Sequence, residues 1–405
     1  MVSRLLDISL RQRLLVIICS IMIGAGGIYA FRTIPIDAFP DVTSVLVQVV
    51  TKAPGLSPAE VERLVTYPIE LQLTGVPSLT EMRSLTKVGL SLITIVFDDS
   101  MDINLARQLV LERLLEVKEQ LPPGAEPMLV PNSTGLGEVF QYYLEAPQRA
   151  AVDTEAEHQS LIVQRTIQDW VIRPLLKSTP EVIDINSMGG YVKQYQVLVE
   201  PGLLRKYGLT LREVFDAVAR NNANAGGNIL EKYDEKYIVR GIGLIRSLQD
   251  IERIVVKETG GTPVFVGDVA QVLIDHAVRH GATVLNGDHE VVSGIVLMLR
   301  GGNARDVVEG LKARIDDIHA KHLLPNGLRI VPFYDRIELI TAALNTVYKS
   351  FAEGVALVVV VLFLFLGNIR SALIVVGTLV LAPLATFIVM GQIGLTANLM
   401  SLGGL

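Results

Sequence analysis

Cysteine, tryptophan and charged residues are scarce in this sequence. Its 405 residues include one cysteine, Cys19, and one tryptophan, and only 19% of them are charged. A single cysteine excludes a disulfide framework within the chain and a zinc site built from several thiolates. The net charge of -6, without a long basic block, argues against nucleic acid as a partner.

Catalytic motifs are missing as well. The sequence has no nucleophile elbow, phosphate-binding loop or HExxH motif, so we expect neither an enzyme nor a resident cofactor. Aromatic residues make up only 6% of the chain, which disfavours a large aromatic pocket for organic molecules. With 50% hydrophobic residues, the chain is too apolar for an ordinary soluble enzyme and too polar for a bundle of membrane helices alone.

Long apolar runs near both ends predict membrane helices. Residues 14–31 (LLVIICSIMIGAGGIYAF) carry no charge and form a helix of about 27 Å, long enough to cross a bilayer. Residues 354–366 and 372–393 flank a short turn with Arg370 and predict a transmembrane hairpin, whose first arm we expect to begin nearer Tyr348. Because of these runs, we expect a lipid bilayer to be one of the partners of the chain.

The stretch that follows the first run, IPIDAFPDVT at residues 34–43, is rigid and acidic. Pro35 and Pro40 fix φ and prevent the helix from continuing, while the aspartates favour water. A cleaved signal peptide is the alternative to a retained anchor, but no A-x-A site precedes Arg32. Because more arginines precede the run than follow it, we expect a cytoplasmic N-terminus and an external region up to the hairpin.

Strand and helix patterns alternate in that region. The order predicted is a strand at 44–51, a helix capped at Ser57, two strands within 79–97, a helix at 102–120 and a strand at 138–145. This β-α-β-β-α-β order is that of a split β-α-β, or ferredoxin-like, unit.

A second round of the same pattern follows. It consists of a helix at 160–177, strands near 182–187, 195–200 and 291–300, a helix at 304–322 and a strand at 328–334. A helix at 209–220 and a Gly- and Asn-rich hairpin that returns at 237–240 interrupt this round and predict an inserted unit. The expected fold class is a membrane protein with an α+β external domain.

Several stretches in their order along the chain resemble the heavy-metal efflux branch of the resistance-nodulation-division (RND) transporters. They are IPIDAFPDVT, APGLSPAEVERLVTYPIE, STGLGEVFQYYL, IQDWVIRPLL, NNANAGGNILE, LRGGNARDVVEGLKARI and ANLMSLGGL. The resemblance implies transmembrane helices that flank ferredoxin-like periplasmic pore subdomains with an inserted docking subdomain. The implied ranges are 1–33 (N-terminus and first membrane helix), 34–134 (first pore subdomain), 135–190 with 276–335 (second), 191–275 (docking subdomain), 336–393 (membrane helices 2 and 3) and 394–405 (the start of a remainder).

The resemblance also implies a function. It predicts an inner-membrane subunit of a proton-driven exporter of heavy-metal cations, a homotrimer that works with a periplasmic adaptor protein and an outer-membrane channel. The hairpin near residues 225–237 would contact a neighbouring protomer. The proton-relay acids are expected on a helix after LMSLGGL, so we expect this chain to be an N-terminal fragment. The alternatives are an RND exporter of organic compounds, and a membrane-tethered periplasmic binding or assembly module without transport activity.

Two carboxylates are the candidate metal ligands. Glu138 begins a predicted strand, and Gly135 and Gly137 permit a close approach of the backbone. The resemblance assigns Glu138 to a metal site and suggests Asp169 as its second acid. The alternative is a solvated glutamate at a strand end and an aspartate held by a hydrogen bond. Hard oxygen ligands suit zinc, cobalt, nickel or cadmium, and the scattered methionines disfavour copper and silver.

The histidines are predicted to be ordinary surface residues. His276 and His280 lie four apart in a segment read as strands, where such side chains do not meet, although Asp288, His289 and Glu290 are nearby in the sequence. His319 and His322 share one face of an amphipathic helix beside Asp316, and solvation is expected there too.

Overall fold

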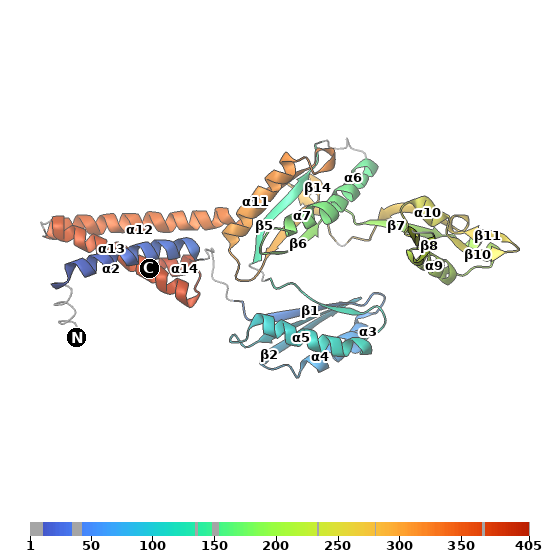
Figure 1. The fold of residues 1–405 in the computed structure, drawn as a ribbon, viewed down its shortest axis with the longest axis horizontal. Helices are drawn as coiled ribbons and strands as arrows, with labels where there is room; N and C mark the ends of the chain where they lie inside the picture. The colour runs from blue at the N-terminus through green and yellow to red at the C-terminus, as the bar shows by residue number, and fades with distance from the viewer. Residues whose placement is uncertain are drawn as a thin grey trace.

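The structure is a computed structural model that describes residues 11–34, 43–133, 137–147, 154–232, 235–279, 281–366 and 369–404. Most of the stretch that follows the first apolar run, residues 35–42, lies outside these ranges, as do Gly135 and His280. The described elements form a helical bundle at one end, two four-stranded sheets with helices, and a further α/β unit at the other end (Figure 1).

Three long apolar helices form the bundle. They are α2 (Arg13–Thr33), α12 (Arg336–Leu366) and α13 (Ile369–Ile393), followed by the short α14 (Leu399–Gly403). All three are long and apolar enough to cross a membrane. Helices α2 and α13 cross closely at Gly27, where an added Cβ would lie 2.5 Å from the Cβ and carbonyl oxygen of Leu384. The predicted membrane runs are therefore helical, and two of them pack together.

Helix α12 begins well before the expected start near Tyr348. It follows directly from the preceding strand, and its first turns bury Ile340 and Leu344 in the core of the α/β region. The prediction was too short because it followed the apolar run, whereas these first turns are amphipathic. The helix thereby connects the bundle directly to the second sheet.

The first sheet has the order β2-β3-β1-β4 and is antiparallel where its strands pair. Its strands are β1 (Leu46–Lys52), β2 (Leu79–Lys87), β3 (Leu90–Phe97) and β4 (Glu126–Leu129). Its helices are α3 (Pro58–Val61), η1 (Glu62–Thr66), α4 (Tyr67–Leu73), α5 (Ile103–Val117) and η2 (Lys118–Gln120). Alternate residues of β1 and β3 are buried, so one face of the sheet packs on the helices.

The second sheet has the order β16-β5-β15-β6. Its strands are β5 (Glu138–Glu145), β6 (Val182–Met188), β15 (Ser293–Met298) and β16 (Arg329–Asp335). Its helices are α6 (Thr154–Ile167), η4 (Gln168–Ile172), α7 (Arg173–Lys177), α11 (Ala304–Ala320) and η6 (Pro325–Gly327), and a small hairpin of β13 (Thr283–Leu285) and β14 (His289–Val291) lies beside it. Its core continues into the helical bundle through Phe387 and Met390.

Two strand assignments from the sequence were wrong. Strand 138–145 does not complete the first sheet, because β4 does so and β5 belongs to the second sheet. The four-residue EPML of β4 contains a proline and is too short to show an alternating pattern. The strand predicted at 195–200 is β7 (Lys193–Val199), which pairs with β12 (Ala270–His276) instead of joining the second sheet.

The segment from β7 to β12, residues 193–276, forms the far unit in Figure 1. Besides β7 and β12 it contains α8 (Pro201–Tyr207), α9 (Leu211–Arg220), β8 (Ala225–Lys232), β9 (Glu235–Gly241), α10 (Leu248–Glu252), β10 (Val255–Thr259), β11 (Thr262–Phe265) and η5 (Val266–Asp268). The predicted helix at 209–220 and the predicted hairpin are confirmed as α9 and as β8 paired with β9.

Candidate functional site

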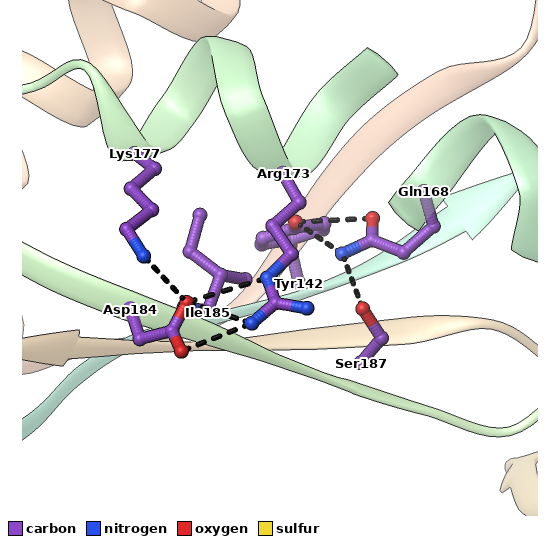
Figure 2. Close-up of polar contacts among 7 residues, drawn as sticks. All are labelled: Tyr142, Gln168, Arg173, Lys177, Asp184, Ile185 and Ser187. Carbon is purple, nitrogen blue, oxygen red and sulfur yellow. Dashed lines mark hydrogen bonds and ion pairs between the residues drawn. The ribbon is translucent and has the colours of Figure 1, made fainter. Parts of the chain in front are cut away.

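A buried polar row crosses the second sheet under its first helix. Tyr142 of β5, Gly294 of β15 and Ser187 of β6 are register partners. The Tyr142 ring lies across Gly294, where an added Cβ would clash with the ring atoms, so only glycine fits there. Gln168 of η4 covers this row, and its amide nitrogen donates to the Tyr142 hydroxyl at 2.9 Å and to the Ser187 hydroxyl at 3.3 Å (Figure 2).

The segment that carries Gln168 is a π-helical turn, and Pro174 explains its position. A proline inside a helix has no N–H to donate and crowds the turn before it, so the preceding residues adopt a wider turn. Asp169 therefore projects from the widened turn η4, between α6 and α7. Such π-helical turns occur frequently at functional sites.

Asp169 has one satisfied and one unsatisfied carboxylate oxygen. Its Oδ2 accepts from Arg165 Nε at 2.8 Å, and Arg165 Nη1 also donates to the carbonyl oxygen of Gly189 at 2.7 Å. Its Oδ1 is buried without a hydrogen-bond partner in the described part of the chain. A buried, ionised oxygen without a donor is costly, so the free oxygen favours the binding of a cation or an ordered water.

Asp184 of β6 lies beside this group and is fully paired. Arg173 Nη2 donates to both of its carboxylate oxygens at 2.9 Å, and Lys177 Nζ lies 3.3 Å from Oδ1 (Figure 2). Burial acts to raise the pKa of Asp184, but the hydrogen bonds from Arg173 and from the Ile185 N–H outweigh it and hold the pKa below its ordinary value. Asp184 is therefore a structural anion, and its partners leave no free oxygen for a metal.

Glu138 is the first residue of β5 and is partly buried. Its Oε2 accepts from the Gln141 amide at 3.2 Å. The preceding Gly137 packs so tightly that an added Cβ would clash with Ser133 Oγ and lie 3.1 Å from the carbonyl oxygen of Met298. The expected close approach of the backbone is thus observed at Gly137.

The two predicted ligands do not form a ready-made pair. No hydrogen bond or ion pair joins Glu138 to Asp169 in the described residues, and neither belongs to a group of three His, Cys, Asp or Glu ligand atoms there. The helix turn of Asp169 contacts β5 at Tyr142, which lies about 13 Å along the strand from Glu138. Glu138 lies on β5 of the second sheet, and Asp169 lies on the turn η4 that packs on this sheet.

The structure also shows a cluster that the sequence did not reveal. His158 of α6 meets Asp275 and His276 of β12, with the ligand atoms of all three within 4.8 Å of one another. His158 is far from Asp275 and His276 in the sequence. The end of β12 lies near α6 because β12 pairs with β7, which contacts α6. The sequence predicted His276 to be an ordinary surface residue, whereas it belongs to this cluster, and His280 lies outside the described residues.

Among the described residues, the other histidines named in the sequence analysis belong to no such cluster. An Asn-Gly turn does join two strands, β13 and β14, with Asn286 and Gly287 at positive φ. His319 is not simply solvated, because its Nε2 accepts from the Ile330 N–H at 3.0 Å. Burial and the nearby Arg329 lower the pKa of His319, although Asp316 opposes them.

The chain belongs to the AcrB/AcrD/AcrF family, which matches residues 5–405. Within that family it is 44% identical over 405 residues to protein HelA of Legionella pneumophila, and 44% identical over 409 residues to the cobalt-zinc-cadmium resistance protein CzcA of Cupriavidus metallidurans strain CH34. These alignments cover all of this chain and 38% of each relative. The resemblance to the heavy-metal efflux branch of RND transporters is thereby confirmed.

A solved structure agrees with this placement. The crystal structure of a heavy metal efflux pump superposes with a TM-score of 0.88 at 36% identity, covering 99% of this chain and 39% of that one. The mixed α/β architecture with apolar helices is therefore that of an RND transporter. The chain spans well under half the length of the relatives it matches.

Proposed function

We propose that a protein containing this chain exports divalent heavy-metal cations across the inner membrane, and that Glu138 and Asp169 contribute ligands on the path. The observation that carries this proposal is the buried, unpartnered Oδ1 of Asp169 on a π-helical turn. A transported cation must be released as well as bound, which suits two carboxylates that are not locked into one complete site.

Arg165 has a defined part in this proposal. Its guanidinium neutralises Asp169 while the site holds no cation, since the two side chains are only 18% and 23% exposed. A divalent cation bound to Oδ1 would weaken that ion pair. Arg165 would then keep its second contact, to the carbonyl oxygen of Gly189.

The choice of cation follows from the ligands and from the relatives. Carboxylates favour zinc, cobalt, nickel and cadmium over copper(I) and silver, which prefer sulfur. One relative is named for resistance to cobalt, zinc and cadmium, and another for nickel and cobalt. We propose the same class of substrate here, with the proton gradient as the source of energy.

The finer architecture is part of the same proposal. Residues 34–134, and 135–190 with 276–335, would be periplasmic pore subdomains, and residues 191–275 a docking subdomain that faces an adaptor protein and an outer-membrane channel. Exposed apolar residues on the β8–β9 hairpin support a homotrimer in which this hairpin contacts the next protomer, because isolated hairpins rarely keep such residues in water. These residues, each more than half exposed, are Ile229, Leu230, Ile238 and Val239.

A zinc titration of the purified full-length protein tests the ligand assignment. Glu138→Ala and Asp169→Asn should each weaken zinc or cobalt binding by about tenfold or more, as expected when a metal loses a ligand or its orienting partner. Glu126→Ala, an exposed glutamate on β4 of the first sheet, is the matched control and should bind normally. Unchanged affinity in Glu138→Ala would remove this residue from the site.

A further inference from the structure

The cluster of His158, Asp275 and His276 lies where the second sheet meets the far unit. His158 is in the first turns of α6, and Asp275 and His276 end β12. The end of β12 is held by two hydrogen bonds, from the Gln196 amide to the His276 carbonyl oxygen at 3.1 Å and from the Ala277 N–H to the Val192 carbonyl oxygen at 2.9 Å. The backbone that carries two of the three side chains is therefore fixed.

Tyr191 orients both imidazole rings. His158 stacks on it with ring centroids 4.2 Å apart and an interplanar angle of 9°, and His276 lies 4.5 Å from Tyr191 and 4.7 Å from His158. The Arg279 guanidinium carbon also lies over the Tyr191 ring, 4.3 Å from its centroid. Glu290 pairs with Arg279 and neutralises it, so this cation does not repel a second one nearby.

The hydrogen bonds of His276 define which ring nitrogen is available. Its Nδ1 lies 2.8 Å from the carbonyl oxygen of Ala277, and a carbonyl can only accept, so Nδ1 carries the proton. In the neutral ring the lone pair is then on Nε2, which faces Asp275 Oδ1 at 3.6 Å. An imidazole held by a backbone carbonyl, with its other nitrogen free, is the usual arrangement of a histidine that binds a metal.

The spacing of the ligand atoms fits a bound cation better than a direct hydrogen bond. A distance of 3.6 Å is too long for a hydrogen bond between Nε2 and the carboxylate. It is close to the roughly 3.3 Å that separates two ligand atoms on a tetrahedral zinc ion with bonds of about 2.0–2.1 Å. The ligand atoms of all three residues lie within 4.8 Å of one another, which is somewhat wider than this spacing.

An acidic pocket of about 490 Å³ lies beside α6 and β14. Acidic residues line it, and an acidic cleft raises the local concentration of divalent cations. They are Glu145, Glu157, Asp288 and Glu290. Of these residues, Glu157 directly precedes His158 in α6, and Glu290 pairs with the Arg279 that covers Tyr191.

We infer that His158, Asp275 and His276 form a second cation site, for a borderline divalent ion such as zinc, cobalt or nickel, with a fourth position open to water. Two imidazoles and one carboxylate are the donors that these ions prefer, and hard ions such as magnesium and calcium would bind poorly. The inference rests on this geometry alone and does not depend on transport or on Glu138. A bound ion would cross-link α6 to the end of β12.

Zinc titration of the full-length protein in the Glu138→Ala, Asp169→Asn background isolates this site. His158→Gln, or Asp275→Asn, should weaken the remaining zinc affinity by at least about tenfold. His322→Asn is the control, because asparagine tolerates the positive φ of 49° at that position, and should leave the affinity unchanged. Equal zinc affinity in all variants would overturn the inference, whatever the result for Glu138.

A footprint of the unsubstituted protein covers the case in which a variant fails to fold. Zinc should protect His158 and His276, but not His322, from carbethoxylation by diethyl pyrocarbonate, and magnesium should protect none of them. Cobalt(II) should give the intense visible absorption of a four-coordinate ion. Equal modification with and without zinc would refute the site.

Discussion

The two four-stranded sheets share one plan and differ in what they bury. In each, the first helix contains a π-helical turn directly before a proline-containing helix, with Pro68 after η1 and Pro174 after η4. The residue five positions before the proline is the exposed Arg63 in the first sheet and the partly buried Asp169 in the second. The same kind of π-helical turn thus carries a cationic side chain beside the first sheet and an anionic side chain beside the second.

The cores of the two sheets also differ in the polar groups that they bury. The first core is apolar apart from hydroxyl groups such as Thr66 and Ser91, which bond to each other at 2.8 Å. The second contains the amide of Gln168, bound to Tyr142, and is continuous with the membrane helices. The comparison indicates that the first sheet is a packing module and that polar chemistry is concentrated in the second.

The largest predicted effect concerns stability in the first sheet. Ile69→Ala, at a fully buried residue of α4, should cost about 2–5 kcal/mol of unfolding free energy because it leaves a cavity. Leu111→Ala, at a residue that is 48% exposed, should cost far less. Thermal unfolding measures both, and zinc titration should show no change in affinity. A loss of zinc affinity in the folded Ile69→Ala protein would contradict the assignment of packing to the first sheet and of polar chemistry to the second.

The next effect tests the polar interior of the second sheet. Gln168→Leu leaves the buried Tyr142 hydroxyl without its amide partner and should cost about 1–3 kcal/mol. Gln159→Leu removes an exposed glutamine of α6 and is the control. If the two substitutions lowered the unfolding temperature equally, the buried polar row would not contribute to the stability of the protein.

A smaller effect compares two ion pairs with the same helical spacing. Arg165→Gln removes the partly buried partner of Asp169 and should cost about 1 kcal/mol after allowance for its partial exposure. Arg212→Gln removes the exposed partner of Asp216 and should cost almost nothing. In the proposed site Arg165 would compete with a cation for Asp169, so Arg165→Gln should also tighten zinc binding. Weaker zinc binding in this variant would contradict the counter-ion role.

The smallest effect is a pH dependence from His319. Its pKa is lowered from the ordinary 6.5, first by burial and then by Arg329, so the unfolded chain binds more protons just below pH 6.5. Stability should therefore fall as the pH decreases through that region. His319→Gln should reduce this slope in unfolding temperature against pH, and His322→Asn should retain it. Identical slopes would show that His319 is not the group responsible.

The sequence predicted the fold more fully than the site, and the reasons are physical. Long apolar runs and strands with clear alternation, such as β1 and β3, were identified because local burial determines their pattern. Strand β4 was missed because four residues with a proline carry no period. Sheet membership of β5 and β7 was misassigned because pairing partners distant in sequence leave no local signal.

The candidate site residues, too, could be predicted only where their signal is local in the sequence. Gly137 and Glu138 form a local motif and could be selected from the sequence, whereas the role proposed for Asp169 depends on a buried oxygen that only packing reveals. His158 and His276 are brought together by strand pairing, and no spacing rule connects them. Tertiary contacts therefore determine most of the candidate chemistry.

The central proposal is that Glu138 and Asp169 bind a cation that the full-length protein exports, and zinc flux tests it most directly. The full-length protein, reconstituted in vesicles with an imposed proton gradient, should move zinc with Glu126→Gln as it does unsubstituted. The double variant Glu138→Gln, Asp169→Asn should lose most of the flux while keeping its unfolding temperature. Undiminished zinc flux in that double variant would contradict the account.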